Sequence, residues 1–280
     1  MKSLQRAKVP FHKMHGSGND FVLIDNRELE LPVSSMPTWA ERICARGFGV
    51  GADGLIFFDS PPEGSGLDYV WHFYNADGSR AEMCGNGSRC AAKLAFELGF
   101  AKQNQIFGTD AGQMEALVLP DSDRVKVRLS KPKDMRLDLT LSGDNLPERV
   151  HFVNTGVPHA VVLSRDALAV DVKTLGSALR NHEHFAPQGA NVNFVQVRDR
   201  DHIFLRTYER GVEDETYACG TGAAAAALIT GALGLTGHKV EAVTSGGEVL
   251  QIFIEDGTVF LQGKAVLVYS GEIYMESLGL

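Results

Sequence analysis

Short hydrophobic runs bounded by glycine, proline and polar residues follow one another along most of this chain, a pattern typical of β-strands. In the first half the pattern predicts strands at residues 11–13, 21–25, 55–58, 69–75, 113–119 and 125–129. In the second half it predicts strands at residues 202–208, 239–243, 249–254, 259–263 and 265–268. A short helix is expected at 39–46, and the stretch 137–149, which contains glycine and proline, breaks the pattern.

Two stretches dense in alanine and leucine interrupt the strands, and each opens with a Cys-Gly-x-Gly element, at residues 83–87 and 218–222. The second stretch, residues 217–237, contains no charged side chain. A helix that is apolar on every side must be enclosed on every side. We therefore expect an α/β (α+β) fold in which a curled, mainly antiparallel sheet wraps a central helix once in each half.

The stretch 217–237 also satisfies the length rule for a membrane span. Its alanines and glycines are only weakly hydrophobic, and the corresponding stretch of the first half carries Arg89, Lys93 and Glu97. We therefore predict an enclosed helix and no membrane span.

The two cysteine elements lie 135 residues apart, and other residues repeat at the same offset. Ala91, Leu98 and Gly112, for example, recur as Ala226, Leu233 and Gly247. The repeat predicts two pseudo-symmetric lobes. Residues 1–130 form the N-terminal lobe with Cys84, joined by a C-terminal strand at 268–280, and residues 131–267 form the lobe with Cys219. Polar residues fall at matching places in both halves with different identities, which suits a ligand whose two ends differ.

The composition excludes several classes of partner. The chain has 280 residues and a formal net charge of −8, without a basic stripe. Nucleic acid and anionic membrane surfaces bind clustered lysine and arginine residues, so we expect neither as a partner. Residues 1–10 do not resemble a secretion signal, and the four cysteines lack the spacing of a disulfide framework. A cytoplasmic protein with reduced thiols is the expectation.

A cysteine at the start of a helix is expected to be a thiol of lowered pKa. The unpaired backbone N–H groups of the first helical turn favour negative charge, so each element offers a thiolate beside a binding site for a carboxylate. Two such thiols facing one another can move a proton across a carbon atom.

Five motifs, in order along the chain, resemble the diaminopimelate epimerase family. They are His15-Gly16-Ser17-Gly18-Asn19-Asp20-Phe21, Asn75-Ala76-Asp77-Gly78-Ser79, Met83-Cys84-Gly85-Asn86-Gly87-Ser88-Arg89, Glu209-Arg210-Gly211 and Glu215-Thr216-Tyr217-Ala218-Cys219-Gly220-Thr221-Gly222. The resemblance implies two lobes that clamp a substrate and the interconversion of LL- and meso-diaminopimelate, in lysine and cell-wall precursor biosynthesis. It implies no cofactor, neither pyridoxal phosphate nor a metal, and a homodimer.

The resemblance also implies roles for individual residues. Cys84 and Cys219 act as thiolate base and thiol acid on opposite faces of the α-carbon, and His159 and Glu209 tune the two thiols. The substrate-binding residues implied are Asn19, Asn75, Gly85, Asn86, Asn154, Asn191, Glu209, Arg210, Gly220 and Thr221. Among these, the planar fork of Arg210 suits a distal carboxylate, and the helix-start amides of the two Cys-Gly elements suit the reacting one.

Two positions depart from the family pattern. Many members carry asparagine where this chain has Val157, so Asn154 or a water molecule is expected to replace that contact. Position 54 is glycine, whereas some members place an amide side chain there.

Other interpretations of the motifs remain open alternatives. The chain also fits another two-cysteine racemase, such as one acting on proline, a thiol redox protein, or an amino-acid binding module without chemistry. The glycine spacing of 49–54 matches a dinucleotide fingerprint, but a helix precedes it and a strand follows, which is the reverse of that motif. His182-Glu183-His184 lacks a convincing third metal ligand.

Overall fold

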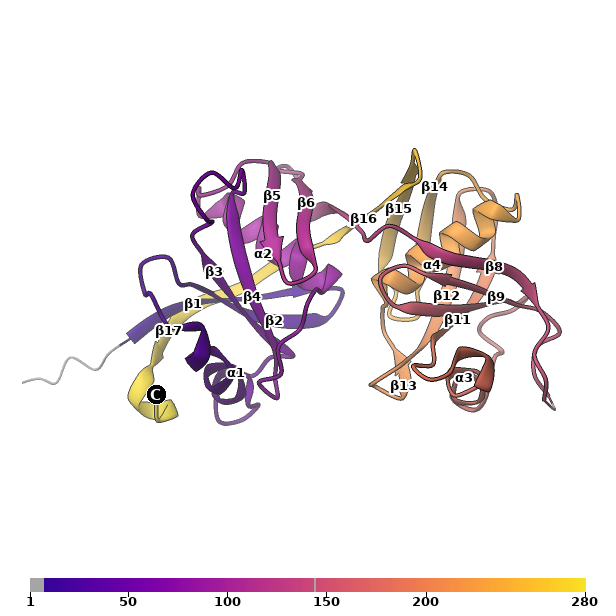
Figure 1. The fold of residues 1–280 in the computed structure, drawn as a ribbon, viewed down its shortest axis with the longest axis horizontal. Coiled ribbons are helices and arrows are strands. Elements are labelled where there is room, and N and C mark those ends of the chain that lie inside the picture. The colour runs from indigo at the N-terminus through magenta and orange to yellow at the C-terminus, as the bar shows by residue number, and fades with distance from the viewer. Residues whose placement is uncertain (1–7, 144) are drawn as a thin grey trace, which may run out of the picture. The chain divides into compact units, whose positions relative to one another are not determined.

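Strands make up most of the secondary structure in the computed structural model, which describes residues 8–143 and 145–280 (Figure 1). The chain divides into two units. Unit 1 holds the described residues up to Val127 together with Lys264–Leu280, and unit 2 holds those of Arg128–Gly263.

The strands of unit 1 form one continuous series of pairings, which begins with the C-terminal strand. In pairing order they are β17 (Val266–Tyr274), β1 (Lys8–Gly16), β2 (Asn19–Asp25), β3 (Gly54–Asp59), β4 (Tyr69–Asn75), β5 (Asn104–Thr109), β6 (Gly112–Val118) and β7 (Arg124–Arg128). The pairs β2–β3 and β4–β5 are parallel and the others antiparallel. The helices of this unit are α1 (Met36–Cys44), α2 (Gly85–Glu97), and the short 3-10 helices η1 (Val33–Ser35) and η3 (Met275–Leu278).

Unit 2 repeats this plan. Its main series is β8 (Lys133–Leu139), β9 (Val150–Asn154), β10 (Pro158–Leu163), β11 (Asn191–Val197), β12 (His202–Glu209), β14 (Lys239–Thr244), β15 (Val249–Glu255) and β16 (Thr258–Lys264). The third and fifth pairings, β10–β11 and β12–β14, are again the parallel ones. The short β13 (Asp214–Thr216) also pairs with β12, and the helices are α3 (Val172–Arg180), α4 (Gly220–Ala232) and the 3-10 helix η2 (Glu183–Phe185).

Each sheet encloses one helix. In unit 2, α4 packs against β9, β10, β11, β12, β14 and β15, and its residues Ala223–Ala227 are fully buried. Alanine side chains let the surrounding strands approach closely on every side. In unit 1, α2 packs against β1, β2, β6 and β17 and is buried from Gly87 to Ala95. The predicted α/β class, with a mainly antiparallel sheet around a central helix, is confirmed.

Several boundaries differ from the predictions. The helix expected at 39–46 is α1, which starts earlier because Pro37 fits its first turn, where no N–H is needed. The strand expected at 265–268 is β17 and continues to Tyr274. Part of the expected break at 137–149 belongs to β8, an exposed strand in which Met135, Leu137 and Leu139 alternate with charged residues. Within residues 8–143 and 145–280, no helix has the length and hydrophobicity needed to cross a membrane.

Candidate active site

Both cysteines of the repeated element cap the N-terminus of an enclosed helix. Cys84 is the N-cap of α2, and its sulfur accepts a hydrogen bond from the Gly87 backbone N–H at 3.5 Å. Cys219 is the N-cap of α4, and its sulfur accepts from the Gly222 N–H at 3.4 Å. The prediction that each Cys-Gly-x-Gly element starts a helix is therefore confirmed.

Close packing explains the second glycine of each element. A Cβ atom on Gly222 would lie 2.3 Å from Oδ1 of Asn193 and 3.2 Å from the Cys219 sulfur. A Cβ atom on Gly87 would lie 3.2 Å from a methyl group of Ile56. Only glycine lets a strand side chain reach the first turn of α4 in this way.

Cys219 is buried, and its environment favours the protonated thiol. Burial is the larger cause and the nearby Glu209 carboxylate the next, and together they raise the pKa of Cys219 to about 12. The Thr221 hydroxyl, 3.5 Å from the sulfur, and the helix-start N–H groups act in the opposite direction. The prediction of a lowered pKa is wrong for this thiol, because the desolvation of a thiolate outweighs the helix amides.

Glu209 ends β12, and its Oε2 accepts a hydrogen bond from the Thr216 hydroxyl at 2.9 Å. Burial raises the pKa of the Glu209 carboxyl, and the bond from Thr216 opposes that shift. Thr216 lies on β13, which pairs with β12 just before the Cys219 loop. Sequence reasoning missed Thr216 as the partner that orients this carboxylate.

His159 is fully buried on β10. Its Nδ1 lies 3.0 Å from the side-chain nitrogen of Asn193, and its Nε2 has no hydrogen-bond partner among the described residues. Burial and the charge of Arg210 lower the pKa of His159 to about 3, so the imidazole is neutral at pH 7. Asn193 was missed by sequence reasoning, although its alternation with Asn191 in a hydrophobic strand was a signal.

Arg210 follows β12, and its backbone N–H donates to Oδ1 of Asn191 at 2.7 Å. Its guanidinium donates to the Gln188 carbonyl at 3.3 Å. Among residues 8–143 and 145–280, no carboxylate lies within ion-pair distance of this guanidinium. Three other arginines of unit 2, Arg149, Arg180 and Arg206, do pair with carboxylates, as in the 2.6 Å contact between Arg206 and Glu215. The charge of Arg210 is therefore available to an anionic ligand.

Around Cys84 the structure gathers asparagine side chains. The Cys84 thiol donates to Oδ1 of Asn19 at 3.7 Å, and the Asn86 amide nitrogen lies 3.3 Å from the same oxygen. The nitrogen of Asn19 donates to Oδ2 of Asp53 at 2.7 Å. Asp53 was not predicted, although it occupies the position that Asn191 occupies in the second half of the repeat.

The remaining predicted residues have separate local partners. Asn75 ends β4 and donates to the Ser79 hydroxyl at 2.9 Å, and the Gly85 carbonyl lies 3.4 Å from the Arg89 guanidinium. A Cβ atom on Gly220 would lie 2.6 Å from Leu261. Gly85 and Gly220 are the first residues of α2 and α4, whereas Asn75 lies at the end of a strand.

Asn154 lies at the end of β9, opposite Pro158. Its Oδ1 accepts from the Gly156 N–H at 2.9 Å in a local turn. It also lines a cavity of about 500 Å³ that contains no other predicted site residue. The lining residues are Asp134, Arg136, Phe152, Asn154, Pro158, His184, Phe185, Ala186, Pro187 and Gln188.

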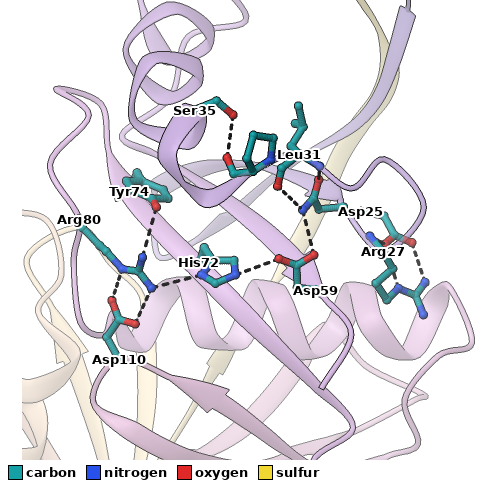
Figure 2. A network of polar contacts seen from close by, with 11 residues as sticks. Asp25, Arg27, Leu31, Ser35, Asp59, His72, Tyr74, Arg80 and Asp110 are labelled. Carbon is teal, nitrogen blue, oxygen red and sulfur yellow. Dashed lines mark hydrogen bonds and ion pairs between the residues drawn. The ribbon is translucent and has the colours of Figure 1, made fainter. Parts of the chain in front are cut away.

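The loop that leads into Cys84 is anchored in unit 1 by a polar network (Figure 2). Arg80 forms an ion pair with Asp110, and its Nη2 lies 3.2 Å from Nδ1 of His72. The other nitrogen of His72 lies 2.9 Å from Asp59. Because a guanidinium only donates, His72 accepts at Nδ1 and donates from Nε2 to Asp59. The network ties the loop before α2 to β3, β4 and the β5–β6 turn.

Within the parts of the chain that the structure describes, no group of three or more histidine, cysteine, aspartate or glutamate residues is arranged to hold a metal ion. In the sequence His182-Glu183-His184, one imidazole lies 2.8 Å from the Ser142 carbonyl, and the other lies 3.2 Å from Arg136.

Other solved proteins share the fold of this chain. A phenazine biosynthesis protein of the PhzF family from Bacillus anthracis superposes with a TM-score of 0.72 at 16% identity, covering 95% of this chain and 99% of that one. A probable proline racemase from Agrobacterium radiobacter K84 gives a TM-score of 0.68 at 13% identity, covering 95% and 92%. At this identity the likeness establishes the fold alone.

Sequence comparison identifies the family among the proteins of this fold. The model of the family described as diaminopimelate epimerase matches residues 11–134 and 151–268. A diaminopimelate epimerase from Aquifex aeolicus (strain VF5) is 46% identical over 96% of this chain and 99% of its own length. One from Hydrogenobaculum sp. (strain Y04AAS1) is 44% identical over 94% and 98%. This chain belongs to the diaminopimelate epimerase family.

Proposed function

We propose that this enzyme, an isomerase, interconverts LL- and meso-diaminopimelate without a cofactor, by moving the α-proton between two cysteines. Family membership supports the reaction. The observation that carries the mechanism is the repeated N-cap, which gives each unit one cysteine sulfur at the start of an enclosed helix. Inversion at carbon needs a base on one face and an acid on the other, and the duplication supplies two equivalent candidates.

Cys84 and Cys219 exchange roles with the direction of the reaction. In one direction the Cys84 thiolate takes the α-proton to form S–H, while the C–H electron pair remains on the α-carbon. The Cys219 S–H then breaks as its proton forms the new C–H bond, which leaves a thiolate. The raised pKa of Cys219 keeps the proton on this sulfur at neutral pH, as this direction requires.

Stabilising the carbanion is the larger chemical task, because an amino-acid α-proton is very weakly acidic. The N–H groups at the starts of α2 and α4, in Gly85-Asn86 and Gly220-Thr221, are the donors we assign to the reacting carboxylate. Removing one donor of this kind typically costs about 3 kcal/mol of transition-state stabilisation.

For the distal end of the substrate we assign Arg210 to the carboxylate. Its guanidinium has no carboxylate partner among the described residues, and its backbone is held by Asn191. Asn19 and Asn75 are proposed as neutral contacts at the same end. Asn154 already accepts from Gly156, so we assign it a contact through a bridging water molecule.

His159 and Glu209 are proposed to tune the thiols. The Glu209 carboxylate raises the pKa of Cys219, whereas His159 is neutral and acts as an N–H donor and not as a cation. Its unpartnered Nε2 is available to substrate or to a sulfur. A fixed neutral donor stabilises a developing thiolate without supplying a proton.

We further propose a cytoplasmic homodimer that serves lysine and cell-wall precursor synthesis. The exposed hydrophobic residues of β17 support an interface there, with Val268, Tyr269 and Tyr274 between 42% and 54% exposed. Sedimentation equilibrium measures the mass directly, and a monomer at all concentrations would contradict this part of the proposal.

Solvent deuterium exchange tests the reaction. With LL-diaminopimelate in ²H₂O, we expect the meso product to carry one deuterium at the inverted α-carbon. Cys84→Ala and Cys219→Ala should each abolish net epimerisation while keeping the fold, as circular dichroism reports. Exchange with proline and none with diaminopimelate would favour a proline racemase. A binding module or a thiol redox protein would show no exchange with either.

A further inference from the structure

Asp53 and Arg89 lie at opposite ends of a chain of side chains that passes the Cys84 sulfur. We propose that Asp53 is a positioning residue which, together with Arg89, orients the amides of Asn19 and Asn86 so that Asn19 presents its oxygen to Cys84. We call the four side chains of Asp53, Asn19, Asn86 and Arg89 the relay. The relay thereby stabilises the S–H form of Cys84. The inference rests on the proposed function, since it assigns a consequence to the proton that Cys84 carries.

Asp53 fixes one end of the relay. A carboxylate accepts hydrogen bonds and donates none, so the 2.7 Å contact to Asp53 Oδ2 must come from the amide nitrogen of Asn19. The amide oxygen of Asn19 then points the other way, toward the thiol at 3.7 Å. Reversing the amide would set an oxygen against a carboxylate.

Arg89 fixes the other end. It is fully buried, and its guanidinium, which only donates, lies 2.9 Å from Oδ1 of Asn86. The nitrogen of Asn86 is therefore the atom that donates to Oδ1 of Asn19, at 3.3 Å. Both amides thus have one orientation, set by a donor-only group and an acceptor-only group.

Asp53 is itself held in place. The backbone N–H of Asp20 donates to Oδ2 of Asp53 at 3.1 Å, and Arg46 contacts Oδ1 at 2.9 Å. Lys13 and Arg46 both pair with Asp20, at 2.6 and 2.7 Å. The charged groups that form hydrogen bonds or ion pairs in this network are Lys13 on β1, Asp20 on β2, Arg46 and Asp53 on the loop between α1 and β3, and Arg89 on α2.

The relay and the first turn of α2 have opposite effects on the protonation of the Cys84 sulfur. The Gly87 N–H stabilises a thiolate, whereas an amide oxygen accepts the proton of a thiol and disfavours the thiolate. A cysteine that removes a proton in one direction of the reaction and returns it in the other must exist both as a thiolate and as a thiol. Asp53 therefore limits how strongly the helix amides favour the thiolate of Cys84.

The experiment measures alkylation of Cys84 by iodoacetamide against pH, with the modified residue identified by mass spectrometry. The background carries Cys219→Ala and Asn86→Ala, because the amide nitrogen of Asn86, oriented by Arg89, would otherwise keep the oxygen of Asn19 in place. Asp53→Ala frees the Asn19 amide to turn its nitrogen to the sulfur. The midpoint of alkylation should then fall by about half a pH unit. Turnover of diaminopimelate is not needed, so a failure of this inference is distinct from a failure of the proposed function.

Asp53→Asn is the matched control for lost charge. The Asp20 N–H holds an oxygen at the Oδ2 position, and Arg46, whose side chain is 63% exposed, is able to withdraw from the new amide nitrogen. The orientation of Asn19 is kept, so the midpoint should stay at the pH measured in the same background with Asp53 present. An equal fall in both variants would mean that charge alone acts, and the relay would be rejected.

Two further measurements close the remaining possibilities. In an Asn19→Ala background, Asp53→Ala should produce no additional shift, and a full shift there would overturn the proposal. If Asp53→Ala does not fold, NMR of the wild-type enzyme decides. A nuclear Overhauser contact between the Asn19 amide protons and the Cys84 β-protons would contradict the orientation, and contacts to the Asp53 β-protons would support it.

Discussion

The side-chain nitrogen of Asn193 lies 3.0 Å from Nδ1 of His159, and this contact determines which ring nitrogen of the buried histidine carries its proton. Asn193 is oriented by the Ala160 carbonyl, which accepts from its nitrogen at 3.2 Å, and the Thr207 hydroxyl donates to its oxygen at 3.0 Å. The amide nitrogen therefore donates to Nδ1, and the proton of the neutral imidazole lies on Nε2. The nitrogen that the protein leaves unpartnered is thus a hydrogen-bond donor.

Asn193→Asp should reverse this tautomer. A carboxylate accepts from Nδ1–H, so Nε2 becomes an acceptor, and the added negative charge raises the pKa of His159 above its present value near 3. We expect a loss of kcat/KM of about 10- to 100-fold. Two-dimensional ¹H–¹⁵N NMR of the imidazole reports the tautomer. Asn181→Asp, on an exposed helix end, is the control, and an unchanged His159 spectrum in Asn193→Asp would contradict the assignment.

How much of the fold the sequence predicts depends on how each strand is buried. Strands with one buried face, such as β14 and β16, show alternating hydrophobic residues and were predicted. β11 is buried on both faces over its first five residues, and β8 is exposed along most of its length. β8 alternates hydrophobic and charged residues although it is exposed, and β11 has Asn191 and Asn193 at buried positions. In both strands the pattern of hydrophobic and polar residues therefore differs from the pattern of burial, and neither strand was predicted.

The same limit applies to the candidate site. Cys84 and Cys219 were identified because the element around them is repeated and local in sequence. Asp53 and Asn193 act through residues on other strands, and the register that brings them close is a property of the sheet. The pKa of Cys219 depends on burial by the surrounding strands, which the motif does not encode. The motif alone therefore predicted a lowered pKa, whereas the pKa is raised.

Glu209→Gln should lower the pKa of Cys219. The carboxylate raises that pKa through its negative charge, and a neutral amide of the same shape removes this cause while burial remains. The ultraviolet absorbance of the thiolate, taken as a difference from a Cys219→Ala protein, follows the titration without requiring access by a reagent. Glu213→Gln, at an exposed carboxylate paired with Arg180, should leave the titration unchanged. Identical titrations in Glu209→Gln and wild type would show that this charge does not act on the sulfur.

Arg210→Lys keeps the charge and loses the planar fork that holds two carboxylate oxygens. We expect kcat/KM for diaminopimelate to fall by about 10- to 100-fold. Any residual α-proton exchange with a substrate that lacks the distal carboxylate should change much less. Measuring both substrates with both proteins gives the coupling between residue and carboxylate. Equal losses would assign Arg210 a structural role in the loop before Cys219.

The lowered pKa of Asp20 predicts that the stability of unit 1 depends on pH. Burial opposes its ionisation, but hydrogen bonds from Arg46 and Lys13 outweigh burial and lower the pKa from 3.8 to about 2. Because the folded pKa lies below the unfolded one, the stabilisation is present above pH 3.8 and disappears as the pH falls to 2. At pH 7, Asp20→Asn should therefore lower the free energy of unfolding by about 2 kcal/mol relative to wild type, as measured by denaturant titration. This difference should shrink below pH 4. A difference independent of pH would point to packing and not to ionisation.

Two glycines of α4 offer a matched pair for the packing around Cys219. At Gly222 a methyl group would overlap Oδ1 of Asn193 at 2.3 Å and crowd the sulfur at 3.2 Å, whereas at Gly231 the nearest atom is 3.9 Å away. Replacing glycine by alanine inside a helix is worth about 1 kcal/mol in helix propensity. We expect Gly231→Ala to raise the melting temperature and leave turnover unchanged.

Gly222→Ala should instead lower the melting temperature and reduce kcat, because Asn193 must move and release His159. The NMR signal of the imidazole separates the two effects: a displaced Asn193 changes it, whereas a purely local adjustment of α4 does not. If both variants were stabilised to the same extent with normal turnover, the close approach of Asn193 to the first turn of α4 would be incorrect. The argument that only glycine fits at this position would then fail.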